Sequence, residues 1–557
     1  YAALAQEIRE FLIEKTAENG GHLASNLGAV ELTMAIFLAF DLPKDKVIWD
    51  VGHQSYTHKI LSGRKDAFDD LRKFGGIAGF PKTNESPCDA FNTGHSSTSI
   101  SAALGMAQAR DLKNEKHSVV AVIGDGAMTG GLAFEGLNNA GSLKADILVI
   151  LNDNQISIDR DTGALHNYLV KVVTSRHYNK LKKSVWDRLG TGRMRNMIQK
   201  AVKSAKRLIG RNTESYSLFD SLGFRYFGPI DGNDIETLTD TLSRLKEIPG
   251  PKLLHVITVK GKGYKPAEDN QTIWHAPGTF DPKTGKRTAS KRNVSKYQEV
   301  FGQTLLDLAN RDPRVVGVTP AMPSGCSMNI MQREIPERVF DVGIAEGHAV
   351  TFSAGLAKEG IIPFCNIYSS FMQRAYDNII HDVALQKLHV IFCIDRAGIV
   401  GNDGATHHGL LDLSYLRPVP NLTIAAPMTG EDLQKMMRLA VYEQDGPIAI
   451  RYPRGRVPET GRLSVGCRSD LGDNSHLMGK ANCLREGDKV AVLSLGAIGC
   501  TVAEAIEETT TTTKTQTKTT TTGAFAHYDM RWLKPIDTEV LEYVGTHFKT
   551  IVTVEDA

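Results

Sequence analysis

Residues 122–131 read VIGDGAMTGG, and this stretch decides the fold of the first part of the chain. An apolar run over 119–123 stops at Gly124-Asp125-Gly126, and a helix-like sequence follows it. This order predicts a buried strand, a turn and then a helix, as in parallel α/β sheets. Such sheets bind ligands beyond the carboxyl ends of their strands, which is where Asp125 stands. Because glycine lets a ligand come close to the backbone, the stretch predicts a binding site.

The same alternation of short β-branched runs and helical patterns extends along most of the chain. It predicts an α/β protein with three domains, each a mostly parallel sheet flanked by helices. Polar, turn-rich stretches near 278–296 and 455–487 indicate the boundaries. The domains are therefore expected at 1–290, 295–470 and 485–557. The predicted strands begin at residues 47, 119, 147, 253, 315, 364, 390, 422, 448, 490 and 550.

Composition and charge exclude several classes of protein. The net charge of +2 over 557 residues provides no bulk field for a polyanion, so no nucleic-acid partner is expected. No apolar run approaches the roughly 18–20 residues of a membrane span, so no membrane partner is expected either. The seven cysteines are scattered without a CxxC pair, which favours reduced thiols in a cytosolic protein. The location we expect is the cytoplasm, of bacterial type. A plastid location stays open if a transit peptide has been removed.

Two segments depart from the α/β pattern. Residues 166–215 form a basic insertion, which is either a solvated helical cover or a site for a polyphosphate or a partner. Our hypothesis is that this insertion is mobile and partly covers the ligand bound at the predicted site. Residues 508–523 are rich in threonine, which has poor helix propensity, and we assign this tract no function.

Asp125 has a counterpart at the end of the next predicted strand. Asn154, in the motif NDN, follows that strand directly. Because a strand–helix–strand unit places its two carboxyl ends side by side, this pair can hold one hard cation such as Mg²⁺, with a backbone carbonyl just beyond as a third ligand. For GDG alone, a simple turn is the alternative. GDG followed by NDN in this context is similar to the fingerprint of thiamine diphosphate enzymes, in which the cation binds the cofactor's diphosphate.

Such enzymes also need a glutamate that hydrogen-bonds the aminopyrimidine ring of the cofactor. Glu346 is the candidate, because it follows a short predicted strand and opens an apolar helix in FDVGIAEGHAVTFSAGLA. Helix capping is the alternative, since a carboxylate in a first turn favours the helix dipole. In a second α/β domain that follows a GDG…NDN module, we favour the catalytic role.

From these motifs the chain resembles the 1-deoxy-D-xylulose-5-phosphate synthase family, within the transketolase-like group. The matching blocks span residues 20–456 and include GGHLASNLGAVELT, FNTGHSSTSISAALGMA, YSSFMQRAYDNIIHDVALQKL and RYPRG. The block IDRAGIVGNDGATHHG separates this family from ordinary transketolases. The resemblance also implies a homodimer and a third domain that is truncated relative to the family.

The resemblance implies a set of site residues. The Mg²⁺ ligands are Asp125, Asn154 and the carbonyl of Ile156. The cofactor is bound by His53, His95, Ser96, Gly126, Ala127, Asn154, Lys260, Glu346 and Phe371. The residues that act on the reacting atoms are Glu346, His22, His53, His275 and His407. The substrates are bound by Tyr368, Arg374, Arg396, Asp403 and Arg454. By contrast, His58 is expected to be structural.

The implied reaction explains these residue types. Pyruvate loses CO₂ and is joined to D-glyceraldehyde 3-phosphate, giving 1-deoxy-D-xylulose 5-phosphate, a precursor of isoprenoids, thiamine and pyridoxal. Histidine suits proton transfer near neutral pH, and the forks of Arg396 and Arg454 suit the acceptor's phosphate. Arg374 is left open between a substrate role and an ion pair. A transketolase and a catalytically silent relative are the alternative functions.

Overall fold

The computed structural model of the chain describes residues 1–154, 164, 168–169, 218–288, 294–458, 478–517 and 523–556. Ile156, most of the insertion at 166–215 and part of the tract at 508–523 lie outside the described residues, so the expectations about them stay predictions. The chain divides into two compact units, Tyr1–Arg287 and Thr288–Ala557. We call them the first and the second unit.

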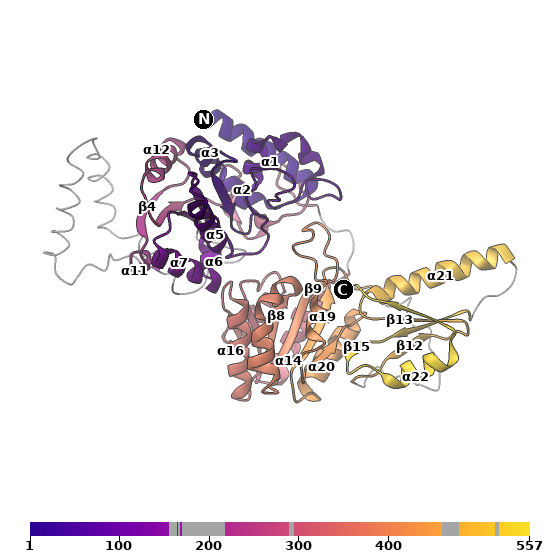
Figure 1. Cartoon of the computed structure of the whole chain (residues 1–557). Helices are drawn as coiled ribbons and strands as arrows, with labels where there is room; N and C mark the ends of the chain where they lie inside the picture. The colour runs from indigo at the N-terminus through magenta and orange to yellow at the C-terminus, as the bar shows by residue number, and fades with distance from the viewer. Residues whose placement is uncertain are drawn as a thin grey trace, which may run out of the picture. The chain divides into compact units, whose positions relative to one another are not determined.

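A five-stranded sheet forms the centre of the first unit (Figure 1). Its strand order is β1-β2-β3-β5-β4, and every neighbouring pair is parallel. All the carboxyl ends therefore lie at one edge of the sheet. The strands are β1 (Lys46–Trp49), β2 (Val119–Gly124), β3 (Leu148–Asp153), β4 (Arg225–Asp231) and β5 (Lys252–Ile257).

Helices cover both faces of this sheet, because its strands are apolar on both sides. On β2, Val119, Ala121 and Ile123 pack with α5 and α7, whereas Val120 and Val122 pack with α3 and α12. Alternate side chains of a strand point to opposite faces, so one short apolar run serves two cores. The helices of this unit are α1 (Ala2–Asn19), α2 (Leu23–Gly28), α3 (Val30–Ala39), α4 (Tyr56–Lys59), η1 (Ile60–Arg64), η2 (Lys65–Asp70), α5 (Ser99–Leu112), α6 (Asp125–Met128), α7 (Gly131–Leu143), α11 (Leu218–Ser221), α12 (Ile235–Lys246), α13 (Lys265–Asp269) and η3 (Ile273–His275).

The second unit contains two sheets. The larger has the order β15-β10-β11-β9-β8-β6-β7 and is parallel except where β15 joins it, and the smaller has the order β12-β14-β13-β16. In the smaller sheet, only β12 runs antiparallel to its neighbour. The strands are β6 (Val315–Thr319), β7 (Val339–Asp341), β8 (Ile362–Tyr368), β9 (Ile391–Ala397), β10 (Thr423–Ala425), β11 (Ile448–Pro453), β12 (Asn482–Arg485), β13 (Val490–Ser494), β14 (Phe525–Asp529), β15 (Trp532–Lys534) and β16 (Thr550–Val554).

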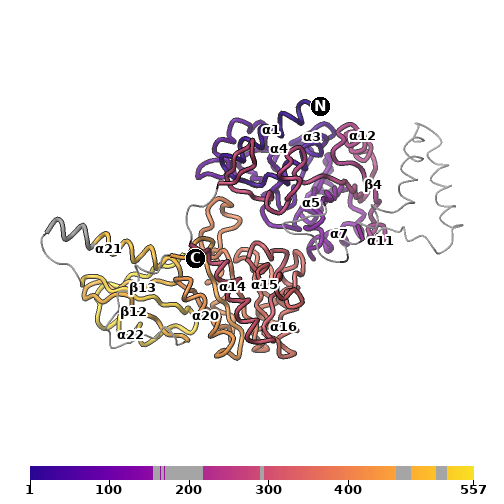
Figure 2. Tube along the Cα trace, turned by 180° about the vertical axis from the view of Figure 1, so that it is seen from behind, coloured from indigo at the N-terminus to yellow at the C-terminus, as the bar shows by residue number. Residues whose placement is uncertain are grey.

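Helices flank these sheets as well, and α14 and α15 lie side by side in the view of Figure 2. The predicted fold class, mostly parallel sheets flanked by helices, is thereby confirmed. The helices are α14 (Tyr297–Arg311), α15 (Asn329–Glu334), η4 (Pro336–Arg338), α16 (Glu346–Lys358), α17 (Ser369–Met372), η5 (Gln373–Ala375), α18 (Tyr376–Asn378), η6 (Ile379–Ala384), α19 (Asp412–Leu416), α20 (Gly430–Tyr442), α21 (Ile498–Thr517) and α22 (Thr538–His547).

The C-terminal part of the chain contributes a strand to the sheet of the preceding predicted domain and packs in the same hydrophobic core. β15 pairs antiparallel with β10, and the guanidinium of Arg451 on β11 lies 3.0 Å from the Asp556 carboxylate. One hydrophobic core also joins residues of both sheets. The division of this unit into domains at 295–470 and 485–557 stays a prediction. In the part of the chain that the structure describes, no helix has the length and apolar character to span a bilayer.

Gly28, the last residue of α2, sets how closely that helix approaches the segment after β5. A Cβ at this position would lie 2.9 Å from the Val259 carbonyl oxygen and 3.2 Å from the Lys260 Cα. We expect Gly28→Ala to destabilise the protein by about 1–3 kcal/mol, the usual cost of overpacking. The measurement is the melting temperature by circular dichroism.

Gly105, which is exposed within α5, provides the matched control because a Cβ there would meet nothing within 4 Å. Gly105→Ala should leave the melting temperature equal or higher, since alanine is the better helix former. Equal melting temperatures of the two variants would show that α2 does not pack tightly against the segment after β5.

Candidate active site

Predicted site residues of the first unit follow four neighbouring strands. His53 comes after β1, Asp125 after β2, Asn154 after β3 and Lys260 after β5. The parallel order β1-β2-β3-β5 therefore collects these segments at one edge of the sheet. The register pairs Gly124 with Asn152, so Asp125 and Asn154 continue from adjacent strand ends, as the sequence predicted.

The oxygen groups at this edge fit a hard cation. Asp125 is buried as the first residue of α6, and Asn154 is partly buried directly beyond β3. The neighbouring Asp153 carboxylate instead lies 2.9 Å from the ring of the buried His255. Among the described residues no three His, Cys, Asp or Glu side chains gather as ligands, but the predicted set needs only one carboxylate. Ile156, the predicted third ligand, lies outside the described residues.

Three histidines from distant segments form a cluster in the first unit. His22 precedes α2, His53 follows β1 and His275 ends η3. Their ring centroids are 5.5 Å apart for His22 and His53, 5.4 Å for His22 and His275, and 5.2 Å for His53 and His275. The Ser25 hydroxyl lies 3.5 Å from Nδ1 of His275. The structure therefore brings together three of the residues that were predicted to act on the reacting atoms.

Burial controls the charge of this histidine cluster. Burial first, and then the charges of His22 and Lys260, hold the pKa of His53 well below its usual range. Burial and the charge of Lys260 do the same to the pKa of His275. Both rings are therefore neutral near pH 7, and a neutral imidazole can donate one hydrogen bond and accept another. Nδ1 of His53 is buried and makes no hydrogen bond within the described residues, so a ligand can satisfy it.

The loop that carries His95 and Ser96 is tied to the strand ends. The two carboxylate oxygens of Asp50 accept hydrogen bonds from the backbone N–H groups of Ser97 and Ser99, at 2.7 and 3.0 Å. The Ser97 hydroxyl donates to the carbonyl of Ala127 at 2.7 Å. The predicted cofactor residues His95, Ser96, Gly126 and Ala127 therefore lie on two segments joined through Ser97.

Three residues beside or among the predicted site residues have a left-handed backbone conformation. Val51, Ser97 and Arg396 have φ angles of 58°, 71° and 61°, in the left-handed region that few non-glycine residues adopt. Val51 lies two residues before His53, Ser97 directly follows Ser96, and Arg396 is itself a predicted substrate residue. Such strain persists where surrounding structure imposes it, and it is common at functional sites.

In the second unit, the predicted residues again follow the carboxyl ends of parallel strands. Glu346 opens α16 shortly after β7, and it is buried. Its carboxylate lies 3.5 Å from the guanidinium of Arg374, which belongs to η5 beyond β8. The ion pair that the sequence left open for Arg374 is therefore present, and its partner is the predicted catalytic glutamate.

A string of side chains connects four other predicted residues of this unit. The guanidinium of Arg396 lies 4.1 Å from the centroid of the Tyr368 ring. That ring stacks on the ring of Phe371, with 5.7 Å between the two centroids. His407 meets the edge of Phe371 at 5.5 Å. Arg396 also forms an ion pair with Asp395, and only 15% of its side chain is exposed. Most of the Arg396 side chain is therefore occupied by contacts with Asp395 and Tyr368 inside the protein.

Arg454 differs from Arg396 in its surroundings. It follows β11, its guanidinium lies 2.8 Å from the Asp403 carboxylate, and 44% of its side chain is exposed. An exposed guanidinium beside one carboxylate retains donors that can reach a phosphate. Of the two arginines predicted to bind the acceptor, Arg454 is the more accessible.

Comparison with known proteins adds a second line of evidence. A family model described as 1-deoxy-D-xylulose-5-phosphate synthase matches residues 1–258, and one described as transketolase, pyrimidine binding domain, matches residues 294–460. A synthase of that name from Parabacteroides distasonis is 52% identical, over 99% of this chain and 85% of its own length. The protein of the same name from Bacteroides fragilis is 51% identical, over 99% of this chain and 84% of its own length. The chain belongs to the 1-deoxy-D-xylulose-5-phosphate synthase family.

The family named from the sequence is therefore confirmed, and so is the enzyme class. Its members are transketolase-class transferases that depend on thiamine diphosphate and make 1-deoxy-D-xylulose 5-phosphate from pyruvate and D-glyceraldehyde 3-phosphate. The alternatives, a transketolase or a silent relative, are not favoured. A solved transketolase from Campylobacter jejuni is 18% identical, over 99% of this chain and 95% of its own, with a TM-score of 0.39, which is too weak a likeness for an argument.

The motifs of this family did not single out Asn26, which holds the histidine cluster together. Its amide nitrogen donates to the carbonyls of His22 and His53, at 2.6 and 2.7 Å, and its amide oxygen accepts from the backbone N–H of Tyr56 at 2.7 Å. One buried side chain thus fixes the two segments that carry His22 and His53. A polar residue inside the buried helix α2 is the only sequence signal that points to it.

Asn26→Asp should separate the two histidine segments, because a carboxylate oxygen would then face two carbonyls. Leaving a buried group unsatisfied costs about 1–3 kcal/mol, so we expect kcat/KM to fall by roughly 5- to 150-fold. The measurement is steady-state formation of 1-deoxy-D-xylulose 5-phosphate by the full chain.

Asn421→Asp is a control for the same change away from the histidines, since the exposed Asn421 donates to the carbonyl of Ala384 at 3.0 Å in the second unit. It should change kcat/KM little. A comparable loss in both variants would mean that the effect of Asn26→Asp does not depend on the histidine segments.

Proposed function

We propose that the residues described above carry out the family's reaction in this chain, the first unit holding the diphosphate and moving protons, and the second acting on the cofactor and the substrates. The observation that carries this proposal is the cluster of His22, His53 and His275 beside the buried Lys260. A cation for the diphosphate and neutral rings for proton transfer then occur together.

The first unit fits the charged end of the cofactor. Asp125 and Asn154 supply oxygens for Mg²⁺, and Lys260, Gly126 and Ala127 supply a charge and backbone donors for the diphosphate. His53, His95 and Ser96 complete this set in our proposal. When bound, thiamine diphosphate supplies a carbon nucleophile and an electron sink. The protein's part is to hold it and to control protons around it.

Glu346 suits the role of moving a proton to and from the aminopyrimidine of the cofactor. It is buried at the start of α16, where the helix dipole favours a carboxylate, and Arg374 supplies a second positive charge. Phe371, which is stacked on Tyr368, offers an aromatic face for the ring.

The histidines and arginines then serve the two substrates. In our proposal His22, His275 and His407, with His53, donate and accept protons at the oxygens of pyruvate and of the aldehyde. Arg454, held by Asp403, binds the acceptor's phosphate, and Arg396 and Tyr368 line the same region. Arg374 reaches the pyruvate carboxylate when it leaves Glu346.

Two further expectations are part of this proposal. The chain acts as a homodimer, as its family resemblance implies, and it works in the cytoplasm. All six cysteines within the described residues are free thiols, which suits a reducing compartment.

CO₂ release from pyruvate tests the proposed function. The purified chain should release CO₂ only with both Mg²⁺ and thiamine diphosphate, and D-glyceraldehyde 3-phosphate should increase the rate. Chelation of Mg²⁺ should abolish the activity, and added Mg²⁺ should restore it. Glu346→Gln should lower kcat by about 10²–10⁴-fold, the usual contribution of acid–base catalysis.

Glu359→Gln, the same change at the exposed far end of α16, provides the control and should retain full activity. Full activity of Glu346→Gln, or release that needs neither cofactor nor metal, would refute the assignment.

Arg454→Met tests the acceptor site. Losing a hydrogen bond to a charged group costs about 1.5–3 kcal/mol, so KM for D-glyceraldehyde 3-phosphate should rise by roughly 10- to 150-fold. Turnover with unphosphorylated D-glyceraldehyde should change little. Arg438→Met, on the exposed surface of α20, should leave both substrates unaffected. An equal loss with both aldehydes would place the phosphate elsewhere.

A further inference from the structure

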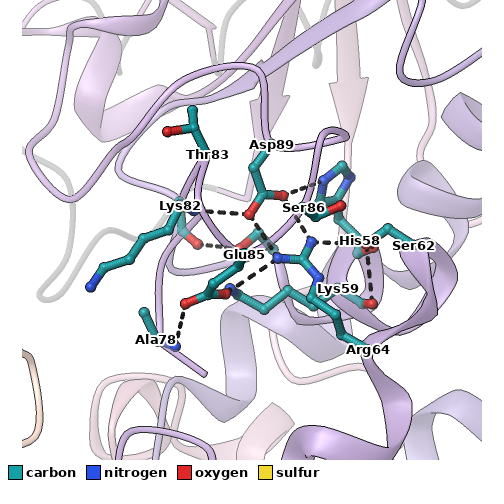
Figure 3. A network of polar contacts seen from close by, with 12 residues as sticks. His58, Lys59, Ser62, Arg64, Ala78, Lys82, Thr83, Glu85, Ser86 and Asp89 are labelled. Carbon is teal, nitrogen blue, oxygen red and sulfur yellow. Dashed lines mark hydrogen bonds and ion pairs between the residues drawn. The ribbon is translucent and has the colours of Figure 1, made fainter. Parts of the chain in front are cut away.

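A buried group of charges lies in the first unit, outside the residues assigned so far (Figure 3). It consists of His58 and Lys59 of α4, Arg64 at the end of η1, and Glu85 and Asp89 of the following loop. We call these five residues the charge cluster. The side chains of His58, Lys59 and Asp89 are wholly buried, and those of Arg64 and Glu85 are nearly so.

The contacts within the charge cluster are short and numerous. The two guanidinium nitrogens of Arg64 donate to the two oxygens of Asp89 at 2.7 and 2.8 Å, and Nε2 of His58 lies 2.9 Å from the same carboxylate. The Lys59 ammonium donates to Glu85 at 2.5 Å, and Arg64 also reaches Glu85 at 3.3 Å. Two cations therefore meet two carboxylates, joined through Arg64.

The protonation states follow from this geometry. Burial tends to raise the pKa of Asp89, but hydrogen bonds from His58 and Arg64 and the charge of Arg64 leave it well below its usual range. Burial lowers the pKa of His58 despite its Asp89 neighbour, so His58 is neutral near pH 7. The cluster is balanced, and removing one charge would leave an uncompensated charge in the interior, which is strongly destabilising.

Both carboxylates also hold the backbone of the loop that bears them. The second oxygen of Glu85 accepts from the N–H of Ala78, and Asp89 accepts from the N–H of Lys82, each at 2.8 Å. The segment 78–93, which we call the clamp loop, is thus folded around its own acidic side chains. Those side chains are in turn anchored to α4 and η1.

The clamp loop reaches the histidine cluster at two points. The ring of the buried Phe80 lies 5.6 Å from that of His22. Pro81 and Thr93 press on Gly52, since a Cβ there would lie 2.3 Å from Cδ of Pro81 and 2.4 Å from Oγ1 of Thr93. Gly52 directly precedes His53. The same loop thus touches one histidine ring and the backbone beside another.

We propose that the charge cluster is a positioning device for the reaction: it fixes the clamp loop, and through Phe80 and Gly52 it sets where His22 and His53 stand. This inference rests on the roles proposed above for those two histidines. Hydrophobic packing could stabilise a loop as well as buried charges do. The directional contacts of Arg64 and Asp89, however, specify one loop position.

Asp89→Asn in the full chain tests this proposal, because it keeps the side-chain size and removes one charge. We expect kcat to fall about tenfold, with KM for D-glyceraldehyde 3-phosphate unchanged, at a temperature well below unfolding. Asp45→Asn is the matched control. Asp45 is a buried aspartate that accepts from the N–H groups of Ser118 and Asp41 and from Lys246, at the amino end of β1. It should lower the melting temperature without changing kcat.

Phe80→Leu tests whether the effect passes through the clamp loop. It should lower kcat by a similar factor, and the double variant with Asp89→Asn should lose little more than either single variant, because residues acting by one route are not additive. If Asp89→Asn does not fold, Glu85→Gln replaces it, since the Glu85 side chain is less completely buried than that of Asp89 and accepts from the N–H of Ala78.

Three outcomes would overturn the proposal: an unchanged kcat in folded Asp89→Asn or Glu85→Gln, a loss of kcat equal to that of Asp45→Asn, or fully additive effects with Phe80→Leu. A His22→Ala variant separates this from a failure of the proposed function. If His22→Ala is fully active, the role of His22 is wrong. If it is inactive while the cluster variants are normal, only the positioning role is wrong.

Discussion

Parallel pairing of the strands is the constraint on which the rest of this protein depends. Parallel strands need long crossover connections, and each connection returns the chain to the same edge of the sheet. In the first unit, that edge receives segments after four strands, and in the second it receives Glu346, Tyr368 and Arg454 in the same way. Each unit therefore brings distant residues together without any of them being close in sequence.

Burial then determines the chemistry of those residues. Desolvation and the charge of the neighbouring Lys260 push His53 and His275 toward the neutral form, although both residues are partly exposed. A solvated histidine would be partly charged near neutral pH and would respond to small changes in pH. The desolvated cluster instead presents neutral rings that can donate and accept protons, and the buried Lys260 beside it presents an ammonium for an anionic group. The same surroundings would suit a diphosphate and two oxygen-rich substrates.

The polar side chains around the histidines do a different task. Asn26 and Asp50 do not carry the proposed chemistry, yet each spends its hydrogen bonds on backbone groups of segments that do. The charge cluster does the same from further away, through Phe80 and Gly52. Burying these charges and amides costs desolvation free energy. In return, their directional hydrogen bonds fix the positions of the segments that carry the histidines. A site for two substrates and a cofactor needs such precision, because small displacements are costly for catalysis.

Local patterns were enough to predict the fold class and the candidate residues Asp125, Asn154 and Glu346, whereas the family and the other candidate residues came from resemblance. The apolar run before Asp125 predicts a buried strand because both of its faces must be covered, and the structure shows two cores on its two sides. Asp125 and Asn154 could be paired from sequence because one strand–helix–strand unit connects them. The placement of His22, His53 and His275 together rested on resemblance rather than on spacing.

Contacts between distant segments could be decided only by the tertiary structure. No sequence pattern predicts that Asn26 forms hydrogen bonds with His53 and Tyr56, which are 27 and 30 positions away. None predicts the hydrogen bond between Arg64 and Asp89 either. The sequence likewise left the role of Arg374 open between substrate binding and an ion pair. In the folded chain Arg374 forms an ion pair with Glu346. A residue's type states which bonds it can make, and its neighbours along the chain determine its local structure. Which partner it meets depends on how the helices and loops pack, and only the folded chain determines that.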